Sequence, residues 1–348
     1  METHGRFGTA KWWPTPDVQP VDFITARAES YAHPGALPTV RPSHLHDDLA
    51  RRDFSINAIA VRVDGAHWGQ IVDEQGGTAD LRAQLVRVLH EQSFVDDATR
   101  MWRAVRYEQR LGFDLEENTA AWLQRDLPYL AAISGDRVRH ELEYILHERE
   151  RVKMLARLDE LHLLAHLHPA CHWSAEAEAA FGRAPTETTT AQWFGLWFAH
   201  LSTGAQEVAM NYLRVTQQTA ALVHGLTHVL HTAAHWSADT RPSVVVDNLR
   251  PFANQPAIWE VAHALFPVSH PAHAHLLAYA SQWRTLRSAV TGDTLRQHGL
   301  PPGPRYKEIL EQLLVAKLDG QVQSPEEELA LLGKILGTDD KGLGTNDQ

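Results

Sequence analysis

The chain has 348 residues, enough for two or three domains, and its 44% hydrophobic and 22% charged residues are typical of a soluble globular protein. The single cysteine, Cys171, excludes an internal disulfide and favours a reducing cytoplasm, and the lack of an apolar run of about 18 residues argues against a membrane partner. A formal net charge of −11 excludes a basic surface over the whole chain, so an RNA partner must meet clustered arginines such as those between Arg82 and Arg110, unless these line an ordinary solvated helix face.

The N-terminal part of the chain is predicted to be rich in β-structure. Val21–Thr25 and Ile59–Val63 have the composition of strands. The prolines and glycine between residues 34 and 42 predict a long loop from Arg27 to a helix that begins near Ser43.

The next segment changes from turn to helix. Gly76-Gly77 is predicted to break the chain, and Asp80 to cap a short helix. From Phe94 onward the spacing of apolar residues is helical, with an apolar face at 101–113 opposite a row of arginines.

The second half of the chain is predicted to be almost wholly helical. Residues 150–285 are rich in Ala, Leu, His and Trp and carry no motif with an evident chemistry. After the breaker at Pro301–Pro304, a helix is predicted at Tyr306–Leu318, and another with Ser324 as N-cap and Pro325 as first residue. The fold class is therefore α+β, a small α+β head followed by a long α-helical body.

One short block concentrates cationic and hydrogen-bonding side chains. Arg51-Arg52-Asp53 is followed by Phe54, Asn57 and an apolar run. Guanidinium groups offer a fork of donors to phosphate oxygens, while aspartate and asparagine can hold ribose hydroxyls. The block predicts a site for a nucleoside triphosphate.

Two further constellations are weaker when taken alone. Asp73-x-x-Gly76-Gly77-x-x-Asp80 fits a ligand-binding turn, but such turns are more often structural. Asp97 and Arg100 are spaced i and i+3, which places both on one face of a helix. A carboxylate beside a guanidinium can read the edge of a base, although an ordinary ion pair explains the spacing as well.

Taken together, these pieces resemble a known family. Arg51–Ala58 reads RRDFSINA and resembles the RRDF-T/S-INA motif of class II tRNA nucleotidyltransferases and bacterial poly(A) polymerases. Asp96–Arg100 resembles the family's acidic-Asp-x-x-Arg motif, and Ser134–Leu142 resembles a later motif. The stretch 291–304 resembles the tail region, so the similarity covers roughly residues 4–150 and 290–335.

The resemblance implies a partial nucleotidyltransferase palm followed by a helical neck, body and tail. The implied segments are a head at 1–90, a neck with the nucleotide-recognition motif at 91–150, a body at 151–285, a tRNA-binding tail at 286–337, and a disordered end at 338–348.

It also implies a function, the template-independent addition of A or CCA to the 3′ end of tRNA from ATP and CTP. Asp97 and Arg100 would form the protein template for the base, and the helical body would grip the acceptor arm of tRNA. The implied nucleotide-binding residues are Arg51, Arg52, Asp53, Asn57, Asp97, Arg100, Arg103 and Arg106.

The likeness favours addition of A or CCA over addition of CC. The loop from Arg27 to Arg51 looks full-length, whereas family members that add only CC lack much of it. Arg6–Ala10 looks more like a tRNA nucleotidyltransferase than a poly(A) polymerase. A poly(A) polymerase and a non-catalytic tRNA-binding paralogue remain alternatives.

One expected feature is missing. The family holds Mg²⁺ on an Asp-x-Asp strand, and no Asp-x-Asp occurs between Met1 and Arg51. Asp22 matches a strand that can supply a third carboxylate but cannot replace the pair. We expect an N-terminally truncated enzyme rather than a short paralogue, and a chain without transfer activity by itself.

The 22 histidines also raise the question of a metal site. His162, His166 and His168 lie close in sequence, as do the three histidines between 270 and 275. No His-Glu-x-x-His pattern accompanies them and Cys171 is isolated, so no metal ligands are predicted.

Overall fold

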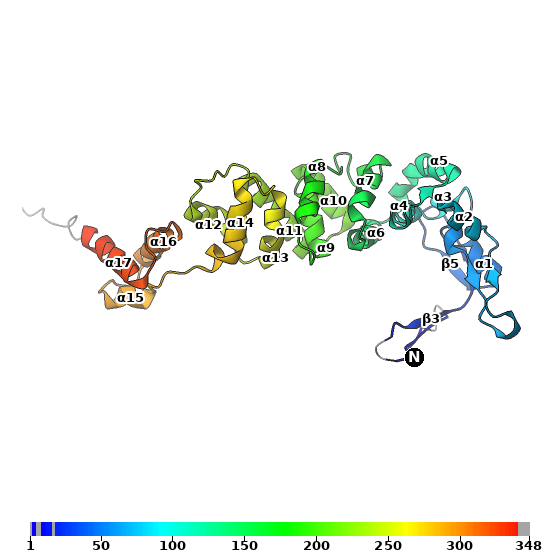
Figure 1. Cartoon of the computed structure of the whole chain (residues 1–348), viewed down its shortest axis with the longest axis horizontal. Coiled ribbons are helices and arrows are strands. Elements are labelled where there is room, and N and C mark those ends of the chain that lie inside the picture. Colours follow the sequence, from blue (N-terminus) through cyan, green and yellow to red (C-terminus); the bar gives the residue numbers. More distant parts are fainter. Residues whose placement is uncertain (1, 5–7, 16–17, 340–348) are drawn as a thin grey trace, which may run out of the picture. The chain divides into compact units, whose positions relative to one another are not determined.

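A computed structural model describes residues 2–4, 8–15 and 18–339, which fold into two compact units (Figure 1). Unit 1 comprises residues 1–173 and 201–215, and unit 2 comprises residues 174–200 and 216–348. These limits differ from the predicted segments, because helix α10 (Thr203–Leu213) packs with unit 1.

Unit 1 contains all of the described strands, which are short and form separate small sheets. The first sheet has the antiparallel order β1-β2-β3, and the others pair β4 with β5, β6 with β7 and, in parallel, β8 with β9. The strands are β1 (Glu2–His4), β2 (Thr9–Trp12), β3 (Val21–Ile24), β4 (Arg27–Ser30), β5 (Thr39–Pro42), β6 (Ala60–Val61), β7 (Ile71–Val72), β8 (Leu85–Val86) and β9 (Asp114–Leu115).

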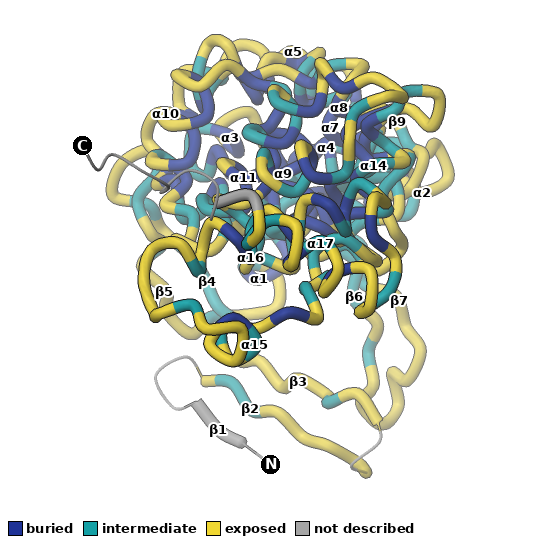
Figure 2. Tube along the Cα trace, turned by 90° about the vertical axis from the view of Figure 1, so that its left-hand side faces the viewer, coloured by how far each residue is buried: buried dark blue, intermediate teal, exposed yellow. Residues whose placement is uncertain are grey.

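Two strands predicted from sequence are present but shorter, as β3 and β6. The predicted loop after Arg27 is wrong in part, since β4 and β5 pair there with Arg27 opposite Pro42. Pro42 at the end of an edge strand needs no ladder hydrogen bond, so a proline at this position did not exclude a strand. Strand β3 is exposed along its whole length (Figure 2).

Helices α3, α6 and α7 pack against α4, at the centre of the unit 1 helices. The predicted apolar face of α4 is buried at Met101, Trp102 and Val105, all 0% exposed, whereas Leu111 at its end is 41% exposed. The helices are α1 (Leu45–Ala50), α2 (Gly77–Ala83), α3 (Ser93–Asp96), α4 (Thr99–Leu111), α5 (Glu117–Asp126), α6 (Gly135–His147), α7 (Arg151–Glu160) and α10, with 3₁₀ turns at Ser55–Asn57, Gly65–His67, Leu127–Ala132 and Leu164–His166.

The glycine-rich turn before α2 holds this helix close to the turn at Ser55. Asp73, not Asp80 as predicted, caps α2 by accepting hydrogen bonds from the amides of Gly77 and Thr78. Asp80 is buried inside the helix and accepts the Ser55 hydroxyl at 2.5 Å. A Cβ on Gly77 would lie 2.2 Å from the Ser55 carbonyl oxygen, so only glycine lets α2 approach the turn that follows Asp53.

Unit 2 is helical, as predicted for this part of the chain. Seven consecutive residues of α9, 192–198, are buried, and α9 packs along α11. Its helices are α8 (Ala175–Arg183), α9 (Thr190–Phe198), α11 (Gln217–Ala233), α12 (Pro242–Leu249), α13 (Pro256–Val261), α14 (Pro271–Ser281), α15 (Gly292–Gln297), α16 (Pro304–Leu318) and α17 (Pro325–Asp339), with 3₁₀ turns at Arg250–Phe252, Ala262–Leu265 and Trp283–Thr285.

The C-terminal helices have a core of their own, made of Val290, Leu295, Ile309, Leu313 and Leu332. Helix α17 begins at Pro325 after the Ser324 cap, as predicted. It continues to Asp339, two residues into the predicted disordered end, and the rest of that end lies outside the described residues. Within the described ranges, no helix is long and apolar enough to cross a membrane.

Candidate functional site

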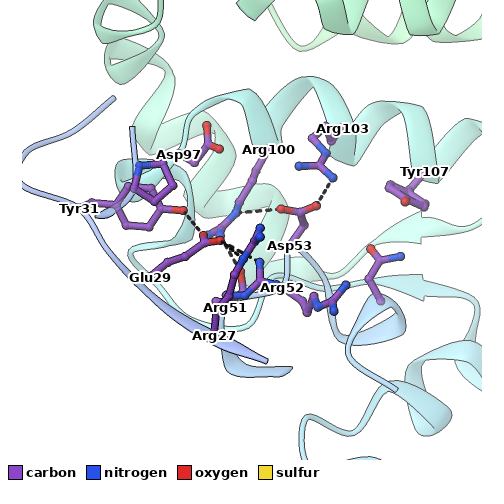
Figure 3. Close-up of a pocket in the computed structure, with 12 residues that line it drawn as sticks. Arg27, Glu29, Tyr31, Arg51, Arg52, Asp53, Asp97, Arg100, Arg103 and Tyr107 are labelled. Carbon is purple, nitrogen blue, oxygen red and sulfur yellow. Dashed lines mark hydrogen bonds and ion pairs between the residues drawn. The ribbon is translucent and has the colours of Figure 1, made fainter. Parts of the chain in front are cut away.

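A polar cavity of about 420 Å³ lies in unit 1 (Figure 3). Its residues come from the β4–β5 hairpin, the turn after α1, and α4 with the residues just before it. The lining is Arg27, Glu29, Tyr31, Pro38, Arg51, Arg52, Asp53, Asn57, Asp97, Arg100, Arg103 and Tyr107.

Seven of the eight residues predicted to bind nucleotide line this cavity, and Arg106 does not. Arg106 points its guanidinium at Glu141 and Glu148, at 3.5 and 3.8 Å, and lies over the ring of Tyr144. The candidate carboxylate Asp22 is also elsewhere, exposed on β3 opposite Lys11.

Asp48 forms the base on which the two adjacent arginines rest. Its carboxylate accepts Arg51 and Arg52 at 2.7 Å each, from opposite oxygens. Burial alone would raise the pKa of Asp48, but hydrogen bonds from Arg52 and Arg51 outweigh it and hold the pKa below its usual value. Both guanidinium groups are thus fixed in position without a ligand.

Glu29 closes the same wall from the β4–β5 hairpin. It accepts Arg51 at 2.9 Å and lies 3.3 Å from Arg27, so the hairpin and the Arg51 turn share one carboxylate. The Tyr31 hydroxyl donates to Glu29 at 3.1 Å, and burial raises the pKa of Tyr31 to about 12. Tyr31 therefore stays a neutral donor at the cavity wall.

Asp53 is held between two arginines of α4. Arg100 lies 3.2 Å from one of its oxygens and Arg103 lies 2.5 Å from the other. Next to Asp53, Phe54 is fully buried and meets the ring of Tyr107 edge-on at 5.5 Å. The turn that carries Asp53 is thereby anchored to α4 by charge on one side and by aromatic packing on the other.

Arg100 is 3% exposed and joins three segments. Besides Asp53, it donates to the carbonyls of Ser93 and Arg51, at 3.2 and 3.0 Å. A guanidinium has five N–H groups, so each of its two terminal nitrogens keeps one N–H for a ligand.

Asp97 and Arg100 do not form the helical i,i+3 pair that the spacing predicted. Asp97 ends α3 in an extended conformation, and α4 begins only at Thr99. Its Oδ1 accepts the Thr99 amide at 3.0 Å and Arg137 at 2.7 Å. Its Oδ2 has no partner among the described residues, so an acceptor remains available beside the cavity.

Two side chains of helix α6 contact residues that line the cavity. Arg137 reaches Asp97 and also the Gly35 carbonyl at 3.4 Å, and Glu141 lies between Arg103 and Arg106. Burial raises the pKa of Glu141 against the pull of the two arginines. The motif at Ser134–Leu142 thus contacts residues that line the cavity.

Sequence reasoning missed several members of this site. Arg27 and Pro38 were absent from the predicted set because the hairpin that presents them was expected to be a loop. Asp48, which supports two arginines of the cavity, was also absent from the predicted set. Its i+3 and i+4 spacing to Arg51 and Arg52 was the available signal.

The described residues do not fit the Mg²⁺ site that the resemblance implies. Among them, no three His, Cys, Asp or Glu side chains gather as metal ligands, and Asp22 has no neighbouring carboxylate partner in an Asp-x-Asp. Of the histidines between 270 and 275, His270 caps α14 and His273 bonds to backbone carbonyls.

The sequence matches two family models. Residues 1–87 match the poly(A) polymerase head domain, and residues 112–173 match a probable RNA- and SrmB-binding site of polymerase A. The cavity is formed mainly by the first match and by the segment between the two, where α4 lies.

Curated relatives and solved structures agree with these matches. An A-adding tRNA nucleotidyltransferase of Halalkalibacterium halodurans is 32% identical, over 94% of this chain and 77% of that protein. One of Geobacter sulfurreducens is also 32% identical, over 96% of this chain, which spans only 40% of its length. A CCA-adding enzyme in complex with ATP has a TM-score of 0.76 at 25% identity, over 96% of this chain and 80% of that one.

Proposed function

Because the chain belongs to the family of tRNA nucleotidyltransferases and bacterial poly(A) polymerases, we propose that its cavity binds the ribonucleoside triphosphate destined for the 3′ end of tRNA. The observation that carries this proposal is the meeting of seven predicted residues, from three segments, in one cavity of about 420 Å³. That volume lies in the range of small-ligand sites.

The arginines of the cavity are suited to bind the phosphates, and its carboxylate and amide side chains are suited to bind the ribose and the base. Arg51 and Arg52 are fixed by Asp48 with their remaining N–H groups available for phosphate oxygens. Asn57 Oδ1 is buried and has no partner among the described atoms, which fits a hydrogen bond from a ribose hydroxyl.

Asp97 and Arg100 fit the selection of A and C over G and U. Adenine and cytosine each present an amino group beside a ring nitrogen that accepts. The unpartnered Oδ2 of Asp97 can accept from the amino group, and a remaining N–H of Arg100 can donate to the ring nitrogen. Guanine and uracil reverse this pattern and leave the buried Arg100 facing a donor.

Within this scheme we favour the addition of A, alone or as the end of CCA. The β4–β5 hairpin is present and contributes Glu29 and Tyr31 to the cavity, and both curated relatives reported above are named A-adding. Since the described carboxylates do not form a metal site, this chain alone is expected to bind nucleotide without transferring it.

Incubation with Mg²⁺, ATP and a tRNA that lacks its terminal A tests whether the chain alone transfers nucleotide. No extension of the tRNA is expected on a sequencing gel, and robust addition of A would contradict it. ATP binding measured by calorimetry separates the nucleotide site from a purely tRNA-binding paralogue, which has no need of ATP. Preference for tRNA over oligo(A) in a gel shift separates it from a poly(A) polymerase.

A further inference from the structure

A second cavity lies in unit 2, built from helices α12, α14 and α16 and the turns next to them. Its volume is about 360 Å³. Helix α16 contributes Lys307, Leu310, Glu311 and Leu314, which are spaced i, i+3, i+4 and i+7 and so share one face. This face therefore presents two leucines together with the charged side chains of Lys307 and Glu311.

The charge in this cavity is unbalanced. Arg250 is paired, with Glu311 at 2.6 Å and Asp247 at 3.2 Å. Arg284, Arg287 and Lys307 have no carboxylate partner among the described residues. This group of cations belongs to a chain whose formal net charge is −11. Arg287 donates to the backbone carbonyls of Arg284 and Leu286, but no carboxylate offsets the mutual repulsion of the three cations, which a bound anion would relieve.

Arg284 gives a second sign of a missing partner. Its Nε is buried and makes no hydrogen bond in the described structure. A buried donor without an acceptor is costly, and an unpaired one in a native fold needs an explanation. Arg284 and Arg287 also lie close enough to Tyr279 to oppose the rise in its pKa that burial causes.

The remaining walls are apolar. Leu310, Leu314, Val246 and Ala253 line the cavity beside the cations. A small molecule with a charged head and an apolar body matches both the cations and the apolar side chains.

From these features we propose that the unit 2 cavity binds a small amphipathic phosphate monoester, with the phosphate held by Arg284, Arg287 and Lys307 and the apolar body against Leu310 and Leu314. Arginine and lysine are the side chains that hold phosphate best. The site is separate from the nucleotide cavity and does not depend on the function proposed for it.

Octyl phosphate is a suitable probe for the full chain, measured by isothermal titration calorimetry. We expect saturable binding at one site per chain, with octanol and inorganic phosphate each bound at least about tenfold more weakly, since each lacks one half of the recognised group. Absence of saturable binding by octyl phosphate, or equal binding of octanol, would overturn the proposal.

Lys307→Glu and Arg287→Glu should each weaken octyl phosphate binding about tenfold or more, because each replaces an attractive charge by a repulsive one. Arg296→Glu is the matched control, since Arg296 is 69% exposed, pairs with Asp293 and lies outside the cavity. Equal losses in all three variants would show a general charge effect and overturn the site.

Saturating ATP should leave octyl phosphate binding unchanged, because the two cavities share no residue. Displacement by tRNA, with Lys307→Glu weakening tRNA and octyl phosphate by the same factor, would assign the cavity to RNA and contradict a small-molecule site. The midpoint of thermal unfolding, followed by circular dichroism, should be unchanged in the variants, which shows that the losses in binding do not come from unfolding.

Discussion

The two cavities of this protein use the same residue types in opposite ways. In unit 1, Arg51, Arg52, Arg100 and Arg103 each touch a carboxylate, from Asp48, Glu29 or Asp53. In unit 2, Arg284, Arg287 and Lys307 line a cavity of similar size with no carboxylate to hold them in the described structure.

The unit 1 arginines are held in one orientation by their carboxylates, whereas the unit 2 cations mainly attract anions. The charge of a paired guanidinium is compensated by its carboxylate and the group is fixed in direction, so its remaining N–H groups suit a ligand of defined shape. Unpaired cations attract any anion of suitable size and select by charge more than by geometry. The unit 1 cavity is therefore the better candidate for base and ribose recognition.

Breaking the support of the unit 1 arginines should have the largest effect. Asp48→Asn removes the buried carboxylate that Arg51 and Arg52 share, although Arg51 keeps Glu29 as a partner. We expect a loss of about 3 kcal/mol in the free energy of unfolding, measured by urea denaturation, because the carboxylate accepts charge-assisted hydrogen bonds from both arginines. Asp64→Asn, at an exposed carboxylate paired with Arg62, should leave the urea midpoint unchanged.

The pH dependence of this effect has a defined sign. The pKa of Asp48 is lowered in the folded state, so its stabilising contribution is present above the unfolded value of 3.8 and disappears as the pH falls through the lower folded value. The stability difference between wild type and Asp48→Asn should be constant near neutral pH and shrink below about pH 4. A difference that grows in acid would contradict the role given to Asp48.

Gly77→Ala should disturb the same site indirectly and with a smaller effect. The new Cβ would meet the Ser55 carbonyl at 2.2 Å and push the turn after Asp53 out of place. We expect a loss of about 2 kcal/mol in stability, together with weaker ATP binding.

Gly182→Ala is the matched control, because this exposed helical glycine has no atom within 4 Å of the added Cβ. The same substitution should stabilise the protein there by about 0.5–1 kcal/mol. Equal effects at both positions would mean that the close approach of α2 to the Ser55 turn is unimportant.

Arg137→Ala should have the smallest effect of the three. It removes the hydrogen bond that orients Asp97 and should weaken ATP binding by about 1 kcal/mol. The free energy of unfolding should change by less than that. Arg139→Ala, whose side chain contacts Glu143 and the Leu213 carbonyl instead, should bind ATP as wild type does. If Arg139→Ala weakens binding as much, Arg137 has no special role.

Sequence reasoning succeeded where short-range patterns set the outcome. The apolar spacing around Trp102 predicted the buried face of α4, and Ser324-Pro325 predicted the start of α17, because both depend on neighbours a few residues away. The residues around Arg51 were found through the motif, and the structure places them around one cavity.

Long-range contacts account for what was missed. Whether Asp97 pairs with Arg100 depends on Arg137 and Asp53, which lie about 40 residues away on either side and compete for the same groups. The β4–β5 pairing and the unit 2 cavity likewise depend on segments brought together only by folding. No local pattern in the sequence carries that information.

If the unit 1 cavity binds a nucleotide and reads its base through Asp97, the preference for particular bases depends on the Asp97 carboxylate. Calorimetric titration of the wild type and Asp97→Asn with ATP, CTP and GTP tests this, with Asp64→Asn as the control because Asp64 is exposed and lies outside the cavity. We expect wild-type binding of ATP and CTP, GTP at least about tenfold weaker, and loss of that preference in Asp97→Asn alone. Failure of wild type to bind ATP saturably, or a base preference unchanged in Asp97→Asn, would contradict it.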